Sequence, residues 1–230
     1  MQNVNKLIDH TLLKAFATSK DIENLCNEAL KYDFKSVCVN PANVKLAAQL
    51  LENSDVLVCT VIGFPLGANT KEVKMLETID AIKNGADEID MVINIGKAKE
   101  HDYRYIEEEI KMVVGAAGGH TVKVIIETCY LTEDEKIACT LAARRAKANF
   151  VKTSTGFGTG GALVSDVATM KANISEDMEV KASGGIRSYD DLQAMVKAGA
   201  TRIGTSNGAK IVEEALKGDA EKWRLHLILK

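Results

Sequence analysis

The sequence lacks the marks of several classes of protein. It contains no run of about 18 apolar residues, so we expect no membrane span. Its first ten residues are polar and mixed, without the apolar core of a secretory signal. The formal net charge is only −3 over 230 residues, which gives no reason to expect nucleic-acid binding. We therefore expect a globular protein whose partners are small molecules.

Patterns for metal ions and disulfides are also missing. The five cysteines form no C-x-x-C pair, and the four histidines show neither H-x-H nor H-x-x-x-H spacing. An odd number of cysteines without local partners is typical of reduced thiols in the cytoplasm. We expect a cytoplasmic protein with no metal site and no cofactor.

Short apolar segments alternate with amphipathic segments along the whole chain. We expect strands ending at or near residues 13, 40, 62, 94, 128, 154, 183 and 205, with about eight helices between and after them. This alternation predicts βαβ units and a parallel sheet. Eight units in this length match a closed (β/α)₈ TIM barrel, and a doubly wound open sheet is the alternative. We expect one α/β domain over residues 1–230, with a short helical extension at its N-terminus.

Two lysines occupy matching positions on neighbouring expected strands. Lys152 and Lys181 lie 29 residues apart, about the length of one βα unit. A lysine within an apolar strand cannot face the helices without burying its charge, so both should point into the mouth of the barrel. The alternative for each is a lysine at a frayed strand end whose stem reaches solvent.

Paired lysines in a barrel mouth indicate imine chemistry. Two ammonium groups close together repel, so one loses its proton more easily and becomes a nucleophile for a carbonyl carbon. The protonated imine then draws electrons from a neighbouring C–C or C–H bond as that bond breaks. Asp90 is suitably placed to move the proton, directly or through water. Alternatively, Asp90 only forms a salt bridge to one of the lysines.

Glycines after the last two strands indicate a phosphate site. Gly184-Gly185 and the segment 204–208 follow strands seven and eight, whose loops often bind phosphate in barrels. The alternative is that these glycines only allow tight turns. The segment 156–161 fits the dinucleotide pattern G-x-G-x-x-G, but the next strand ends in a lysine and not in an acidic residue, so we expect no nicotinamide cofactor.

Seven segments match the motifs of a known family in order. They are IDHTLL at 8–13, VCVNP at 37–41, VIGFPLG at 61–67, EIDMVIN at 88–94, KVIIET at 123–128, FVKTSTG at 150–156 and VKASGGIR at 180–187. Over essentially its full length, the chain resembles the deoxyribose-phosphate aldolase family. The resemblance implies a class I aldolase that needs no metal and cleaves 2-deoxy-D-ribose 5-phosphate reversibly to D-glyceraldehyde 3-phosphate and acetaldehyde.

The resemblance also implies roles for individual residues. Lys152 falls on the family's Schiff-base lysine, Lys181 on the second lysine that perturbs it, and Asp90 on the aspartate of the proton relay. The positions that line the substrate or hold its phosphate are Thr155, Gly156, Gly184, Gly185, Gly204 and Ser206. Dimers or tetramers are common on this fold, so we expect a homo-oligomer.

The chain departs from the family at two places. Some members carry a phosphate-binding lysine where this chain has Phe157, so phosphate should bind more weakly and unphosphorylated substrates should be better tolerated. Some members end in a tyrosine that assists proton transfer, whereas this chain ends Leu-Ile-Leu-Lys at 227–230. Another group or water would then move that proton, or the step is slower.

Three other functions remain open from the sequence. One is a different Schiff-base aldolase or transaldolase on the same barrel. Another is a phosphosugar isomerase in which Asp90 is the base and Lys181 is structural. The third is a barrel that binds a phosphosugar without turnover.

Overall fold

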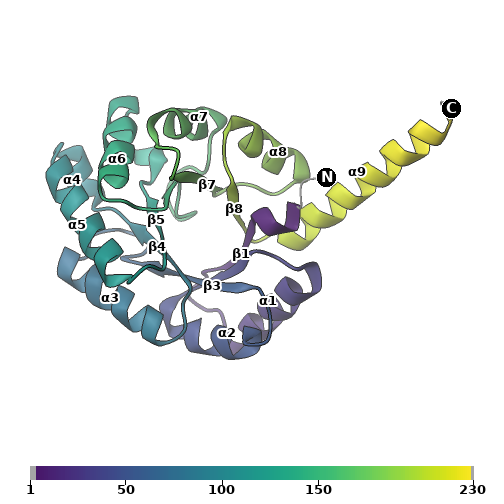
Figure 1. Cartoon of the computed structure of the whole chain (residues 1–230), viewed down its shortest axis with the longest axis horizontal. Coiled ribbons are helices and arrows are strands. Elements are labelled where there is room, and N and C mark those ends of the chain that lie inside the picture. Colours follow the sequence, from purple (N-terminus) through teal and green to yellow (C-terminus); the bar gives the residue numbers. More distant parts are fainter. Residues whose placement is uncertain (1–3, 229–230) are drawn as a thin grey trace.

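Eight parallel strands close into a barrel in the computed structural model, which describes residues 4–228. Each strand pairs with its neighbours in the sequence, and the last strand pairs with the first (Figure 1). The strands are β1 (Ile8–Leu12), β2 (Ser36–Val39), β3 (Leu57–Ile62), β4 (Glu88–Val92), β5 (Thr121–Ile125), β6 (Phe150–Lys152), β7 (Glu179–Ser183) and β8 (Arg202–Thr205). The predicted single-domain (β/α)₈ barrel is confirmed, and the open sheet is wrong.

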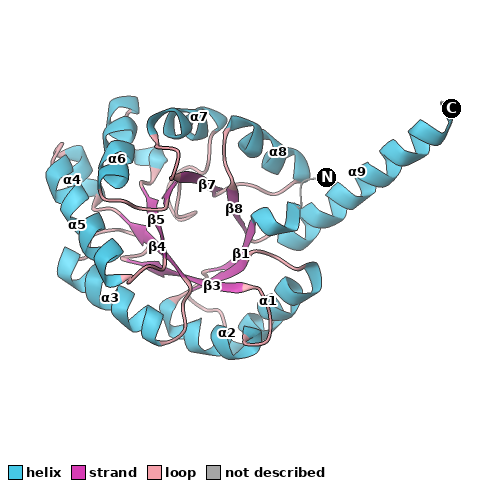
Figure 2. Cartoon of the chain, viewed as in Figure 1, coloured by secondary structure: helices cyan, strands magenta, loops and turns pink. Residues whose placement is uncertain are grey.

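Helices form a ring around the barrel (Figure 2). They are α1 (Ser19–Tyr32), α2 (Val44–Leu51), α3 (Lys71–Lys83), α4 (Ile95–Lys99), α5 (Tyr103–Ala116), α6 (Glu133–Arg145), α7 (Val164–Asn173), α8 (Tyr189–Ala198) and α9 (Gly208–Ile228). Short 3₁₀ turns are η1 (Val4–Leu7), η2 (Pro41–Asn43) and η3 (Thr128–Tyr130). The predicted N-terminal extension is η1, whereas the five-residue helix α4 was not predicted.

The last helix differs from the others in its position. It starts beside β1 and η1, and its distal part extends away from the barrel (Figure 1). None of the described helices is long and apolar enough to cross a membrane.

Side-chain alternation separates an apolar outer layer from a charged interior. On β4, Ile89 and Met91 belong to the apolar core, which includes buried residues of the surrounding helices. Glu88 and Asp90 on the same strand form ion pairs with Lys123 of β5. Because successive side chains on a strand point to opposite faces, a two-residue period places the carboxylates inside the barrel.

The register between strands sets which inward side chains are neighbours. Lys152 on β6 is the direct partner of Lys181 on β7, and Asp90 on β4 is the partner of Lys123 on β5. The predicted adjacency of the two lysine strands is therefore confirmed. Loops at the carboxyl ends of these strands form the mouth above them.

Candidate active site

Lys152, Asp90 and Lys181 meet inside the barrel. The Nζ of Lys152 and the Nζ of Lys181 each lie 2.7 Å from the same carboxylate oxygen, Oδ2 of Asp90. All three side chains are buried, but Lys152 also lines the open cavity at the carboxyl end of the barrel. The structure thus brings the three predicted catalytic residues together, with an amine at the cavity and a carboxylate and second amine behind it.

Asp9 and Lys123 extend this cluster on the side away from the cavity. Oδ2 of Asp9 lies 2.5 Å from the Nζ of Lys181, so Lys181 contacts two carboxylates. The Nζ of Lys123 lies 2.8 Å from Oδ1 of Asp90 and 2.7 Å from Oε2 of Glu88. Among the ion pairs of the described residues, Lys152 has one partner, Asp90.

An arginine also belongs to this charged network. Arg202 Nη1 lies 2.8 Å from Oδ1 of Asp9 and 2.8 Å from Oε2 of Glu88, and its guanidinium lies 5.2 Å from the centre of the Phe150 ring. The network holds four basic side chains, from β5 to β8, and three acidic ones, from β1 and β4. When all are ionised, one positive charge is therefore left over.

Electrostatics fix the charges of the groups behind Lys152. Burial by itself would lower the pKa of Lys181, but the carboxylates of Asp9 and Asp90 outweigh it and raise that pKa. Burial would likewise raise the pKa of Asp90, but Lys123, Lys152 and Lys181 hold it well below its usual range. In the resting site at neutral pH, Lys181 is therefore an ammonium and Asp90 a carboxylate. Lys152, with its single carboxylate partner and its open side, is the amine of this cluster that a molecule in the cavity can reach.

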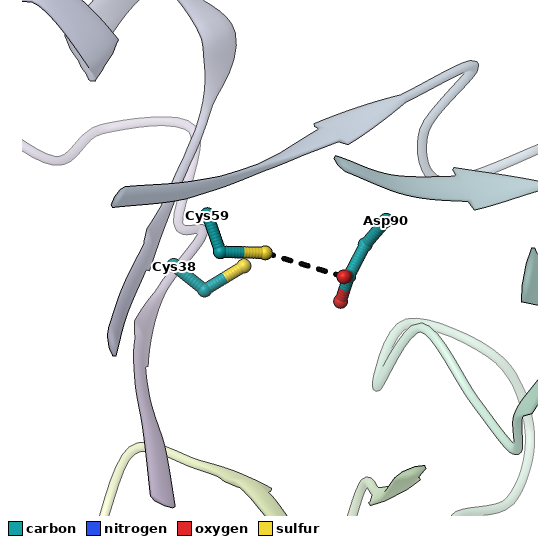
Figure 3. Close-up of side chains that lie close together, drawn as sticks. All are labelled: Cys38, Cys59 and Asp90. Atoms are coloured by element: carbon teal, nitrogen blue, oxygen red, sulfur yellow. Dashed lines mark hydrogen bonds between the residues drawn. The ribbon is translucent and has the colours of Figure 1, made fainter. Parts of the chain in front are cut away.

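Two cysteines also lie near Asp90. Cys38 of β2 and Cys59 of β3 are register partners, and the Cys59 thiol donates to Oδ1 of Asp90 at 3.2 Å (Figure 3). The two sulfurs and a carboxylate oxygen of Asp90 lie within 4.8 Å of one another, so this set could hold a soft metal ion. Both Asp90 oxygens already accept lysine ammonium groups, which a metal ion would have to displace.

The cavity above Lys152 gathers the predicted substrate residues. Its volume is about 290 Å³, near the lower end for small-molecule pockets. Its lining includes all six residues that the resemblance assigns to the substrate or its phosphate: Thr155, Gly156, Gly184, Gly185, Gly204 and Ser206.

Two of these positions favour glycine for different physical reasons. Gly184 has φ +88°, and a Cβ there would lie 3.0 Å from the Cα of Gly161, so a side chain would be strained in conformation and crowded in space. A Cβ at Gly204 would lie 2.9 Å from the Cβ of Ser183 and 3.2 Å from the Cε of Lys181. Gly204 therefore makes room for the second lysine as well as lining the cavity.

Two cations of the cavity were not predicted from the sequence. Lys14, in the loop after β1, and Arg187, just before α8, both line it. Helix α9 begins at Gly208, directly after Ser206 and Asn207 of the lining, and N–H groups at such a helix start attract anions. This side of the cavity is thus suited to a phosphate group.

Part of the cavity wall is apolar. Phe157 is 55% exposed and packs edge-to-face on Phe64, with ring centres 5.3 Å apart and planes at 88°.

The other expected departure from the family pattern is the chain end at 227–230. Residues 229 and 230 of this segment lie outside the part of the chain that the structure describes.

The complete site can therefore hold a small carbonyl compound that carries an anionic group. The carbonyl carbon would meet the amine of Lys152, and the anion would meet the glycine loops and the two cations. Asp90 and water at the cavity can move protons between the reacting atoms.

Four members of the charged network were missed from the sequence: Asp9, Glu88, Lys123 and Arg202. Lys123 stands within an apolar strand, so the rule that selected Lys152 and Lys181 would have selected it. Glu88 lies two residues before Asp90 and so shares its face. Asp9 gives no comparable local signal, because its partners come from strands far away in the sequence.

Comparison with known proteins shows that this chain is similar to aldolases. The model of the DeoC/LacD family of aldolases matches residues 4–225. A deoxyribose-phosphate aldolase of Clostridium perfringens (strain SM101 / Type A) is 60% identical over 213 residues, which are 92% of this chain and 95% of that protein.

Solved structures of aldolases are also similar to this chain. The structure of QR15, an aldolase, is 40% identical with a TM-score of 0.90, and the match covers 100% of both chains. A tetrameric deoxyribose phosphate aldolase from Aeropyrum pernix is 37% identical with a TM-score of 0.82, covering 91% of this chain and 89% of that one.

Proposed function

Since this chain belongs to the DeoC/LacD family of aldolases, we propose that it cleaves 2-deoxy-D-ribose 5-phosphate reversibly to D-glyceraldehyde 3-phosphate and acetaldehyde. The observation that carries the proposal is the position of one amine. Lys152 opens to a cavity that Lys14 and Arg187 also line, while its Nζ lies 2.7 Å from a carboxylate that also holds a second ammonium.

The reaction begins with imine formation. The neutral amine of Lys152 adds to the aldehyde carbon of the open-chain sugar, and loss of water gives a protonated imine. Lys181 remains an ammonium next to Asp90, so a positive charge lies behind the amine of Lys152 during the attack. Asp90, directly or through water, takes and returns the protons of these steps.

Cleavage follows at the bond between carbons 2 and 3 of the sugar. The hydroxyl on carbon 3 gives up its proton, the C–C bond breaks, and its electron pair moves to the imine to form an enamine. Carbon 3 becomes the aldehyde of D-glyceraldehyde 3-phosphate. Protonation of the enamine and hydrolysis then release acetaldehyde and regenerate the amine.

The phosphate is held at the other end of the cavity. Backbone N–H groups around Gly184 and Gly185 and at the start of α9 would hydrogen-bond its oxygens, with Ser206 beside them. Lys14 and Arg187 would supply the positive charge that a lysine at position 157 supplies in some family members.

Borohydride trapping tests this function. Incubation with acetaldehyde and sodium borohydride should add an ethyl group of about 28 Da to Lys152, and Lys152→Ala should lose the label. Lys217→Ala, which removes an exposed lysine of α9, is the matched control and should keep it. A folded protein that stays unlabelled would refute imine chemistry and favour an isomerase with Asp90 as base. Label on Lys181 would exchange the roles of the two lysines.

The proposed substrate is tested separately by turnover. Purified protein should release acetaldehyde from 2-deoxy-D-ribose 5-phosphate, detected by a coupled alcohol dehydrogenase. Trapping without this turnover would indicate another Schiff-base aldolase on the same barrel.

We also propose a homo-oligomer in the cytoplasm. The solved relative from Aeropyrum pernix is tetrameric, and α3 exposes an apolar row of Val73, Leu76 and Ile79 that a second copy could cover. All five cysteines are outside disulfides, as is typical of a reducing compartment. Light scattering after size exclusion and fractionation of the source cells test the two statements.

A further inference from the structure

A buried histidine of β1 lies against the start of α9. His10 is 3% exposed and shares a face of the strand with Ile8, which belongs to the apolar core outside the barrel. A Cβ at Gly208, the first residue of α9, would lie 2.9 Å from Nδ1 of His10 and 2.9 Å from Cζ of Phe34. The absence of a side chain at Gly208 therefore allows the helix to begin directly on the His10 ring.

One hydrogen bond fixes the orientation of this ring. Nε2 of His10 lies 2.7 Å from Oε2 of Glu28 in α1, whereas Nδ1 is buried and has no hydrogen-bond partner among the described residues. Burial lowers the pKa of His10 and outweighs the Glu28 carboxylate and the Thr205 backbone carbonyl, which raise it. His10 is therefore neutral at neutral pH, with its proton on Nε2 and donated to Glu28.

The segment between β8 and α9 connects the His10 ring to the cavity above Lys152. His10 is the register partner of Thr205 on β8. The three residues that precede Gly208 all line the cavity: Thr205, Ser206 and Asn207. The Asn207 N–H donates to the Thr205 hydroxyl at 3.0 Å, which makes the segment compact. A displacement of Gly208 would therefore also displace the N–H groups that face the cavity at the start of α9.

Aromatic contacts on the same side hold the next turns of α9. The Tyr32 hydroxyl donates to Oε1 of Glu213 at 2.6 Å, and the Tyr32 ring stacks on Phe34 with ring centres 5.6 Å apart. Phe34 in turn contacts the His10 ring, with centres 4.8 Å apart. Because the distal part of α9 extends away from the barrel (Figure 1), the contacts of its first turns set the position of the helix.

We propose that His10, held by Glu28, is a positioning residue for the phosphate-binding segment of the site. This inference rests on the proposed aldolase function. The His10 ring sets how closely the start of α9 approaches β1, and it touches neither the reacting atoms nor the phosphate. Without the hydrogen bond to Glu28 the ring can turn, and the N–H groups at the cavity lose their alignment with the phosphate oxygens. The attack of Lys152 on an aldehyde without a phosphate does not need this alignment.

Kinetics with and without a phosphate test the proposal. Glu28→Ala should raise KM for 2-deoxy-D-ribose 5-phosphate about tenfold, the contribution of one hydrogen bond to a charged group. Its rate of borohydride trapping with acetaldehyde, which carries no phosphate, should equal that of the wild type. Glu23→Ala is the matched control, because Glu23 is also a partly exposed carboxylate of α1 but pairs with Lys20 at 3.0 Å. This control should leave KM unchanged.

Substitutions at the ring and at the start of the helix test the same contact from its other sides. His10→Phe keeps a ring beside Phe34 but removes the donor to Glu28, so KM should rise as in Glu28→Ala, and the double variant should show no further increase. His10→Gln keeps an N–H donor near the position of Nε2 and should restore the wild-type KM. Gly208→Ala, whose methyl group would press on the ring, should also raise KM while leaving acetaldehyde trapping unchanged.

The outcomes that would overturn the proposal differ from a failure of the proposed function. An unchanged KM in folded Glu28→Ala and His10→Phe would overturn it. A KM that rises only in His10→Phe would assign the effect to ring packing and overturn the role of the hydrogen bond. An equal loss of phosphosugar cleavage and acetaldehyde trapping would show a general structural role and also overturn it. Absence of both activities in the wild type would instead overturn the aldolase function on which the inference rests.

Discussion

Removal of the second lysine should slow imine formation without unfolding the protein. In Lys181→Met, the charged network keeps three bases and three acids, so its surplus positive charge disappears. Asp90 Oδ2 then has Lys152 as its remaining ammonium neighbour. The attack of Lys152 on an aldehyde then loses the effect of a second positive charge behind it.

The geometry gives the size of this effect. Both Nζ atoms lie 2.7 Å from one oxygen, so they are separated by at most twice that distance, about 5.4 Å. Two unit charges at this separation repel by about 3 kcal/mol at an effective dielectric constant of about 20. At about 1.4 kcal/mol per factor of ten, imine formation should slow by about a hundredfold.

Quenched borohydride trapping measures this rate. The wild type and Lys181→Met are mixed with acetaldehyde, reduced after set times and quantified by mass spectrometry at Lys152. Lys74→Met is the matched control: Lys74 is also fully buried and pairs with Glu109 at 2.6 Å, but between α3 and α5. This control should lose stability yet label at the wild-type rate. Equal rates for folded Lys181→Met and wild type would refute the electrostatic argument.

Four other outcomes follow from the same structure. Burial opposes ionisation of Asp9 and Asp90, but nearby cations outweigh it and lower the pKa values of both carboxyl groups in the folded state. Their contribution to the free energy of unfolding is therefore complete above the ordinary aspartate pKa of 3.8 and is lost as the pH falls through the lowered values. Urea titrations should show the free energy of unfolding declining below about pH 4, and a flat profile would contradict this. Arg202→Met should lower that free energy by about 3–5 kcal/mol, because two buried carboxylates lose a partner; a loss below about 1 kcal/mol would argue against it. Phe157→Lys should lower KM for the phosphorylated aldehyde about tenfold through a charge-assisted hydrogen bond, and an unchanged KM would place the phosphate elsewhere. A thiol reagent should modify Cys129 alone in the native protein, since the other cysteines are buried, and mass spectrometry would reveal any second modified site.

The sequence was most informative where one residue type breaks a local pattern. Lys152 and Lys181 could be selected because a lysine inside an apolar strand has only one acceptable direction. Asp90 could be selected because the two-residue period and the barrel rule place it inside. These inferences need only the strand, its face and its order in the chain.

The partners of these residues depended on closure of the barrel. Asp9 contacts Arg202 across 193 residues of sequence because β1 pairs with β8, and the same closure brings Asp9 to Lys181. A second cavity of about 200 Å³ beside the site likewise requires Leu66 and Phe157 from two loops and Ile95 from the start of α4 to converge.

The sequence alone therefore determined the alternation of strands and helices, the order of the units and the inward face of each reactive side chain. Local spacing carries this information, since helix and strand periods are properties of neighbouring residues. Only the tertiary structure decided which lysine stays charged, where the glycines make room and that a second cavity exists. Register and closure set these contacts between distant strands, and no local propensity encodes them.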